Sequence, residues 1–282
     1  MIHLISSPKK MQEFALSLKK KGKKISFVPT MGALHKGHLS LVERAKNLGD
    51  FVVVSIFVNP TQFGPKEDYK KYPRDLKKDK ELLLKAGCDL ILAPKVNDIY
   101  PEGYLTYIDV EELSQKLEGA SRTGHFKGVC TVVAKLFNIV QPDFAIFGQK
   151  DAQQALIIKK MTEDLNFSVK IIVCPTVREK DGLACSSRNS YLNTEERDQA
   201  KILYQSLKLG EKLIKAGEKN PLKVIKKMTE MIQQMPLAKI DYIALTDTQT
   251  LEPVRKIKGE LLLSLAVKFG KTRLIDNIKI CV

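Results

Sequence analysis

The stretch from Phe51 to Val58 constrains the fold of this chain more strongly than any other. It reads FVVVSIFV and is apolar except for one serine. A strand with one face in water alternates apolar and polar residues, whereas an unbroken apolar run is typical of a strand covered on both faces. The sequence therefore predicts a central strand of a sheet that has helices packed on both sides.

The first 176 residues continue this pattern, with apolar runs separated by amphipathic segments. This β-α alternation predicts an α/β fold with a doubly wound, Rossmann-like parallel sheet. Strands are expected at 25–28, 51–58, 89–94, 143–148 and 168–174, and helices at 39–48, 76–86, 128–140 and 150–165.

The pattern changes after about residue 176. Two lysine-rich helices are expected at 194–216 and 221–235, and they are followed by short predicted strands at 239–247, 259–269 and 271–282. We therefore expect a Rossmann-like domain over residues 1–176 and a smaller C-terminal α+β domain over residues 177–282, joined by a short hinge.

The net charge of +15 raises the question of a nucleic-acid partner. The lysines gather on the expected solvent faces of helices, as in SLKKKGKK and DLKKDKELLLKAG, and no basic stripe is interleaved with aromatic residues. We therefore expect no nucleic-acid partner. The N-terminal residues lack the pattern of a signal peptide, and no apolar run approaches the roughly 20 residues that span a bilayer, so we expect a cytoplasmic protein with no membrane contact.

The cysteines at 88, 130, 174, 185 and 281 are scattered and form no CxxC pair. Neither a disulfide framework nor a zinc site is expected from this spacing.

The decapeptide PTMGALHKGH, residues 29–38, follows the first expected strand and leads into a helix. Gly32 allows the backbone to turn, and Gly37 allows a ligand to approach the start of the helix, where N–H groups and partial positive charge favour phosphate. His35 and His38 are three residues apart and can point to the same side. Phosphate binding is the favoured interpretation, and histidines that merely cap the helix are the alternative. A zinc protease helix would need histidines four apart with a glutamate, and that pattern is absent.

The decapeptide resembles the HIGH motif of class I aminoacyl-tRNA synthetases and small nucleotidyltransferases. Those enzymes also use a second, mobile loop with a basic residue, for which SSRNSYL at 186–192 is the candidate. Longer segments make the resemblance closer: VPTMGALHKGHLSLV, VSIFVNPTQFGPKEDYKKYPR, HFKGVCTVVAKLFNIVQPDFAIFGQKDAQQ, PTVREKDGLACSSRNSYL and TRLIDNI are similar to segments of the pantothenate synthetase (pantoate–β-alanine ligase) family, in the same order.

That resemblance implies an ATP-dependent ligase that forms a pantoyl adenylate and pyrophosphate from pantoate, then pantothenate and AMP on attack by β-alanine. It also implies ATP as a substrate, Mg²⁺ with the ATP phosphates, and a homodimer. The alternative is another nucleotidyltransferase of the superfamily that keeps the adenylate as its product.

The resemblance also implies roles for individual residues. The implied catalytic residues are His38 as proton donor, His35, Lys150 and Arg188. The implied ATP-binding residues are Met31, Gly32, Ala33, Leu34, His35, Lys36, Gly37, His38, Gly148, Gln149, Lys150, Asp151, Val177, Cys185, Ser186, Ser187 and Arg188. The implied ligands of pantoate and β-alanine are Gln62, Gln154, Asn59 and Arg122.

We make one further prediction for each of three residues, Cys185, His125 and Asp79. The family usually has methionine at the position of Cys185, and an exposed thiol there would make the enzyme sensitive to oxidants. The segment around His125 is expected to be a flexible stretch over the active site. Asp79 is expected on a charged helix face rather than as a metal ligand, and no residue is predicted to bind metal directly.

Overall fold

A computed structural model describes residues 2–65 and 67–282 of the chain. These residues form two compact units. The first unit comprises the chain up to Gln149 together with Gln153–Pro175, and the second comprises Lys150–Ala152 together with Thr176–Val282. The short turn at 150–152 therefore belongs to the second unit, although the chain on either side of it belongs to the first.

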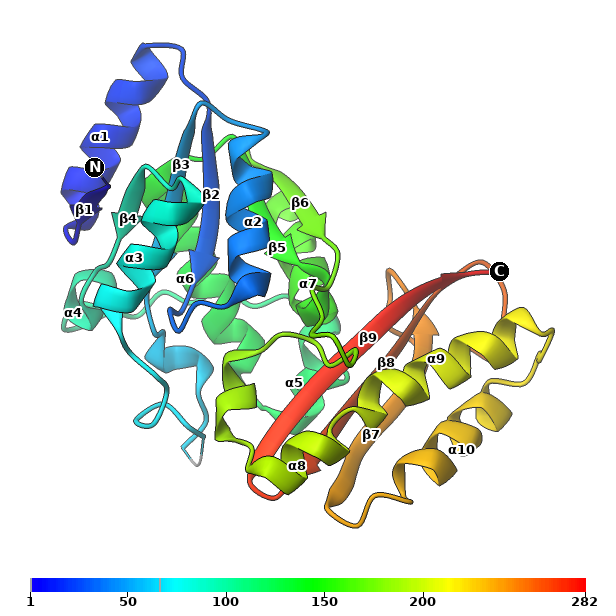
Figure 1. Cartoon of the computed structure of the whole chain (residues 1–282). Coiled ribbons are helices and arrows are strands. Elements are labelled where there is room, and N and C mark those ends of the chain that lie inside the picture. The colour runs from blue at the N-terminus through cyan, green and yellow to red at the C-terminus, as the bar shows by residue number, and fades with distance from the viewer. Residues whose placement is uncertain (1, 66) are drawn as a thin grey trace. The chain divides into compact units, whose positions relative to one another are not determined.

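The first unit contains a six-stranded parallel sheet with the strand order β1-β4-β3-β2-β5-β6 (Figure 1). This arrangement confirms the predicted doubly wound parallel sheet. The strands are β1 (His3–Ile5), β2 (Ile25–Thr30), β3 (Phe51–Ile56), β4 (Leu90–Leu92), β5 (Phe144–Gly148) and β6 (Lys170–Cys174). The edge strand β1 was not predicted, because three residues are too few to show a period.

Helices cover both faces of this sheet (Figure 1). Successive residues of β3 alternate between the two faces: Val53 packs in the core under α1 (Pro8–Lys20), α6 (His125–Val140) and α7 (Ala152–Asp164), and Val52 and Val54 pack under α2 (Lys36–Lys46) and α3 (Leu76–Ala86). Both sets of side chains are buried, which explains the unbroken apolar run at 51–58. Shorter helices are α4 (Val96–Ile99), α5 (Glu118–Ser121), η1 (Pro60–Gln62), η2 (Leu113–Gln115), η3 (Gln149–Asp151) and η4 (Ser187–Tyr191).

The strand order reverses direction between β2 and β5, which are hydrogen-bonded neighbours with Ser26 opposite Phe144. In such sheets the crevice beyond the carboxyl ends of the strands at this switch point is the usual ligand site. The two segments that leave the sheet there are the turn after Thr30 and the turn after Gly148.

The second unit has a three-stranded antiparallel sheet in the order β7-β8-β9, formed by β7 (Ala238–Asp247), β8 (Glu260–Phe269) and β9 (Thr272–Cys281). Side chains of α9 (Ile202–Lys215) and α10 (Pro221–Ile232) share its apolar core. The single helix expected at 194–216 is instead two helices, α8 (Thr194–Gln199) and α9. The chain tightens between them, where the Leu203 N–H donates to the Ala200 carbonyl only three residues back.

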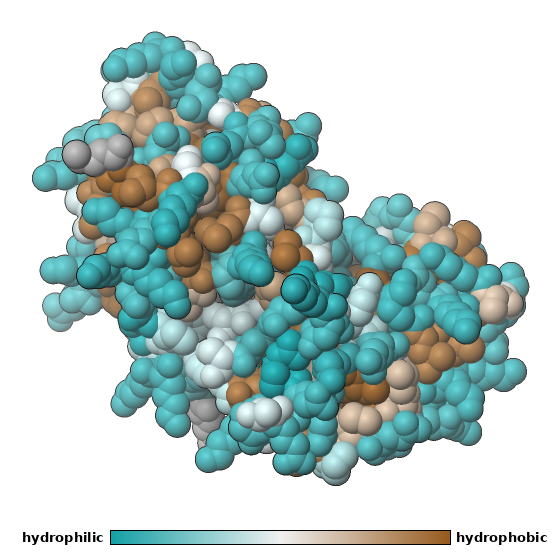
Figure 2. Space-filling model, viewed as in Figure 1, coloured by the Kyte–Doolittle hydropathy of each residue, from teal (hydrophilic) through white to brown (hydrophobic). Residues whose placement is uncertain are grey.

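Lysines of the stretches SLKKKGKK and DLKKDKELLLKAG were expected on solvent faces of helices. Lys20, Lys21, Lys77 and Lys78 are exposed, as expected. Hydrophilic residues dominate the face of the molecule shown in Figure 2. Within residues 2–65 and 67–282, no helix is both long and apolar enough to cross a membrane.

Candidate functional site

The two histidines of the decapeptide cap the start of α2. The His35 Nδ1 accepts a hydrogen bond of 3.2 Å from the Gly37 N–H, and the His38 Nδ1 accepts one of 3.3 Å from the His35 N–H. The two rings lie against each other with their centroids 4.0 Å apart and their planes tilted by 37°. The capping role, which is the alternative to phosphate binding, is therefore present, and it satisfies N–H groups that have no partner within the helix.

Each capping hydrogen bond uses one nitrogen of its ring, Nδ1 in both histidines. A neutral imidazole that accepts at Nδ1 carries its proton on Nε2, so each ring is held as an Nε2–H donor. The reciprocal contacts also fix the orientation of both rings. Both rings are therefore oriented at the start of α2, where the positive end of the helix dipole lies.

Asp79 holds the turn that precedes these histidines. Its carboxylate accepts hydrogen bonds from the N–H groups of Ala33, at 3.0 Å, and Leu34, at 2.8 Å. The expectation that Asp79 lies on a charged helix face is wrong, since its residue is only 2% exposed. Burial raises the pKa of this carboxyl, and the two backbone donors act in the opposite direction.

The same turn is conformationally demanding. Ala33 has a φ of 51°, and Gly32 has a φ of 80°. A Cβ at Gly32 would lie 2.9 Å from the Asp79 Oδ2, so glycine is required both for the backbone angle and for the close approach of the carboxylate. No sequence period identifies Asp79, because its partners lie 45 and 46 residues away.

Asn59 and Gln62 follow β3 and are buried, as a functional interpretation of NPTQF requires. The Asn59 amide donates to the Gln62 Oε1, and the Tyr100 hydroxyl donates to the Asn59 Oδ1 at 2.8 Å. The Gln62 Nε2 donates to the Met31 Sδ at 3.1 Å. The loop after β3 therefore touches the turn after β2 within the first unit.

Arg122 contacts this loop at the Gln62 carbonyl and is paired with Glu67, to which it donates two hydrogen bonds of 2.7 Å. Burial acts to raise the pKa of the Glu67 carboxyl, but the hydrogen bonds and charge of Arg122 outweigh it, so the pKa lies below its usual value. Sequence reasoning missed Glu67, which lies 55 residues away along the chain.

The His125 ring connects Arg122 to Gln62. Its Nδ1 lies 2.8 Å from the Gln62 carbonyl oxygen, and its Nε2 lies 3.1 Å from the Arg122 Nη1. This geometry requires a neutral ring with its proton on Nδ1, because both an arginine donor and a carbonyl acceptor are satisfied. Burial first, and then the Arg122 charge, lower the pKa of His125 to about 4. His125 is buried at the first residue of α6, so the flexible covering segment expected there is a helix start instead.

Strand β5 ends at Gly148, and η3 follows with Gln149, Lys150 and Asp151. The Lys150 and Asp151 side chains lie 3.4 Å apart. Gln154, at the start of α7, is half-buried. Its neighbour Gln153 is buried, and its side chain accepts a hydrogen bond from the Glu118 N–H and donates to the carbonyls of residues 113 and 116. These hydrogen bonds connect the irregular segment before α6 to α7.

The predicted phosphate loop lies in the second unit, at the end of a short hairpin. The Cys185 N–H donates to the Val177 carbonyl at 2.9 Å, and the Ser186 Oγ accepts from the Arg188 N–H at 3.2 Å at the start of η4. Ser187 and Arg188 are half-buried in this turn. Cys185 is buried, with 8% exposure, so the exposed thiol considered from the sequence is not present.

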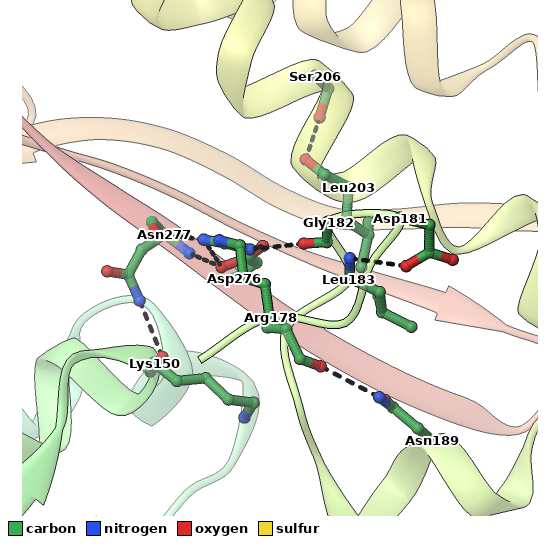
Figure 3. A network of polar contacts seen from close by, with 11 residues as sticks. Lys150, Arg178, Asp181, Gly182, Leu183, Asn189, Leu203, Ser206, Asp276 and Asn277 are labelled. Carbon is green, nitrogen blue, oxygen red and sulfur yellow. Dashed lines mark hydrogen bonds and ion pairs between the residues drawn. The ribbon is translucent and has the colours of Figure 1, made fainter. Parts of the chain in front are cut away.

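A polar network in the second unit was not foreseen (Figure 3). Asp276 on β9 binds Arg178 through hydrogen bonds of 2.6 and 3.0 Å, and the neighbouring Asn277 donates from Nδ2 to the Lys150 carbonyl at 2.8 Å. Burial raises the pKa of the Asp276 carboxyl, while Arg178 lowers it. The sequence offered one signal, the similarity of TRLIDNI to the family, but no chemical role for it.

Among residues 2–65 and 67–282, no three histidine, cysteine, aspartate or glutamate side chains cluster as metal ligands would.

Comparisons with known proteins agree with one another. A family model described as pantoate-beta-alanine ligase matches residues 3–279. A pantothenate synthetase of Thermodesulfovibrio yellowstonii is 57% identical over 98% of this chain and 99% of its own length. The crystal structure of pantothenate synthetase from Thermus thermophilus superposes with a TM-score of 0.95 at 44% identity, over 100% of both chains. A pantoate-beta-alanine ligase from Francisella tularensis, solved in complex with beta-gamma ATP and beta-alanine, has a TM-score of 0.82 at 39% identity, over 99% of this chain and 97% of the other.

Proposed function

Since this chain belongs to the pantoate–β-alanine ligase family, and is therefore an ATP-dependent ligase that joins pantoate to β-alanine in pantothenate biosynthesis, we propose that it works through a pantoyl adenylate. A pantoate carboxylate oxygen attacks the α-phosphorus of ATP, and the bond to the bridging oxygen of pyrophosphate breaks. The β-alanine amine then attacks the acyl carbon, AMP leaves with the bridging carboxylate oxygen, and the amine loses a proton.

One observation carries this proposal: the contact of 3.1 Å between the Gln62 amide and the Met31 sulfur. It brings the loop after β3 against the turn after β2, at the carboxyl edge of the sheet where ligands of such folds bind. A carboxylate bound beside Gln62 would lie next to a nucleotide bound along residues 31–38. Such proximity is the main catalytic device available to an enzyme that needs no covalent intermediate.

On the nucleotide side, His38 and His35 act as oriented donors to the α-phosphate, with His38 as the proton donor. Lys150 and Arg188 stabilise the negative charge that develops on the phosphates in the transition state. Backbone groups and side chains of the remaining ATP-binding residues hold the nucleotide. Those residues are Met31, Gly32, Ala33, Leu34, Lys36, Gly37, Gly148, Gln149, Asp151, Val177, Cys185, Ser186 and Ser187.

On the acid side, Gln62, Asn59 and Gln154 hold pantoate and β-alanine by hydrogen bonds. Because the Arg122 guanidinium is already paired with Glu67, its charge is largely neutralised before substrate arrives. We infer that Arg122 acts on the substrates chiefly through the Gln62 carbonyl, to which its Nη2 lies at 3.4 Å.

Mg²⁺ enters as part of the MgATP substrate, because it prefers phosphate oxygens and water to a dedicated protein cage. The chain is further proposed to be a cytoplasmic homodimer. Sedimentation at micromolar concentration tests the assembly, and a mass of one chain would contradict it.

Oxygen-isotope transfer tests the adenylate directly. Pantoate labelled with ¹⁸O in its carboxylate should transfer one labelled oxygen to AMP when β-alanine is added. Pantoate alone should release pyrophosphate, up to about one equivalent per site if the adenylate stays bound. AMP without label would exclude the adenylate, and the absence of pantoate-stimulated pyrophosphate release would exclude this order of steps.

The alternative, a nucleotidyltransferase that keeps the adenylate as its product, predicts continued pyrophosphate release with pantoate and no effect of β-alanine on AMP formation. It leaves Gln62 and Gln154 without the role in holding β-alanine that the ligase gives them. The isotope experiment separates the two interpretations, because only the ligase produces AMP.

A further inference from the structure

The turn that carries Lys150 is held by the C-terminal strand of the second unit. Residues 150–152 group with that unit, although the chain before and after them belongs to the first. A hydrogen bond of 2.8 Å from the Asn277 Nδ2 to the Lys150 carbonyl oxygen makes the connection (Figure 3). It joins residues 127 positions apart, and it involves the main chain of a lysine rather than its side chain.

The alternation of β9 explains why adjacent residues have different partners. Successive side chains of a strand point to opposite faces, so Asp276 shares a face with Leu274 and Ile280, which pack in the core of the second unit. Asn277 points to the other face, toward Lys150. Both residues are nevertheless buried, with exposures of 2% and 5%.

Asp276 fixes β9 to the hairpin that leads into the phosphate loop. Its partner Arg178 also donates to the Gly182 carbonyl at 3.1 Å, and its guanidinium lies 3.9 Å from the centre of the Tyr204 ring. The hairpin closes with the hydrogen bond from the Cys185 N–H to the Val177 carbonyl, directly before Ser186. The Asp276–Asn277 dipeptide therefore holds, side by side, the main chain of Lys150 and the root of the loop that carries Arg188.

We propose that Asn277 is a positioning residue for Lys150 and that it sets the place of this lysine relative to the Ser186–Arg188 loop. The inference rests on the proposed role of Lys150 in adenylation. Its physical reason is that lysine has a long, flexible side chain whose reach is determined by where its main chain is held. Fixing the carbonyl of residue 150 reduces the range of positions that the ammonium can take, and misplacement of a catalytic group by about 1 Å can cost on the order of 100-fold in rate.

The substitution Asn277→Asp tests this proposal at constant side-chain size. It replaces the donor by an acceptor that repels the Lys150 carbonyl. We expect the maximal rate of pantoate-dependent pyrophosphate release to fall on the order of 10-fold to 100-fold. Asn277→Ala, which removes the donor without adding charge, should act in the same direction if Asn277→Asp fails to fold.

Asn220→Asp is the matched control, because it makes the same chemical change in the second unit. Asn220 is exposed and caps α10 by accepting from the Leu222 N–H, which aspartate does equally well. This variant should keep the wild-type rate. Circular dichroism and thermal unfolding should show that the Asn277 variant used is folded at the assay temperature.

A double-mutant cycle separates positioning from a merely structural role. If Asn277 acts through Lys150, then Asn277→Asp should slow the wild-type enzyme but should have little further effect on Lys150→Met, as measured by release of ³²P-labelled pyrophosphate. An equal fold-loss in both backgrounds, or a wild-type rate for folded Asn277→Asp and Asn277→Ala, would overturn the inference. A wild-type rate for Lys150→Met alone would instead contradict the proposed role of Lys150, and the two failures are therefore distinguishable.

Discussion

Acidification should weaken the first unit, because His125 is buried there as a neutral imidazole. Its ordinary pKa of 6.5 falls to about 4 in the folded protein, first through burial and then through the Arg122 charge. The Gln62 carbonyl and the carboxylates of Glu67 and Glu118 oppose this shift without cancelling it. The unfolded chain therefore binds a proton between these two pH values that the folded chain does not bind.

The sign of the effect follows from this difference. The contribution of His125 to the free energy of unfolding is fully present above pH 6.5 and is lost as the pH falls to about 4. The shift corresponds to about 3 kcal/mol, at 1.36 kcal/mol for each pKa unit. Solvent screens the His125 charge little, because the residue is 8% exposed, so the full pKa shift contributes to the free energy of unfolding.

The substitution His125→Asn removes the titrating group and keeps a donor at the position of Nδ1, so that the Gln62 carbonyl retains its partner. The variant should be less stable than the wild type near neutral pH, because packing and the Arg122 contact are lost. Its free energy of unfolding should nevertheless fall less steeply than that of the wild type between pH 6.5 and 4. The difference in free energy of unfolding between the two proteins should shrink by about 3 kcal/mol over that range.

The assay must report on one unit, because a two-unit chain need not unfold in a single step. Pulse-labelling hydrogen exchange of peptides from α6, measured across a urea series at each pH, gives the unfolding free energy of the region around His125. His3→Asn is the control, since it removes an exposed histidine on β1 and should leave the pH dependence as in the wild type. Parallel pH curves for the wild type and His125→Asn would refute the reasoning.

Three other substitutions or treatments test the site. Asp79→Asn leaves one N–H of the turn proposed to bind ATP without an acceptor, so it should lower the free energy of unfolding in urea by about 1–3 kcal/mol and raise the KM for ATP. An unchanged KM would show that the turn does not need the carboxylate. His38→Ala should slow pantoate-dependent pyrophosphate release on the order of 100-fold, and a near-wild-type rate would reduce its role to capping α2. Alkylation of the native enzyme should label the exposed Cys281 before the buried Cys185 and leave activity intact. Peptide mass spectrometry identifies the labelled cysteine, and pantoate-dependent pyrophosphate release measures the activity. Rapid labelling of Cys185 with loss of activity would contradict its burial.

The parts of the fold that sequence predicted are those with a local period. The apolar side chains at 51–58 can be buried only if both faces of the strand are covered. The strand β3 accordingly lies in the interior of a parallel sheet. The helix expected at 39–48 begins three residues earlier, at Lys36, because His35 caps it through a ring nitrogen rather than through one of the common capping side chains. The break between α8 and α9 leaves no such trace, because neither glycine nor proline marks it.

The sequence by itself determined the parallel sheet and the helix that follows PTMGALHKGH, because apolar periodicity records burial along one segment of chain. Only the tertiary structure decided which polar groups meet. Asp79 binds the turn after β2, Glu67 neutralises Arg122, and Asn277 holds Lys150. Each of these contacts joins segments 45 or more residues apart. Sequence reasoning misses them because the residues around a carboxylate or amide in the sequence have the same pattern whether that group faces water or a buried partner.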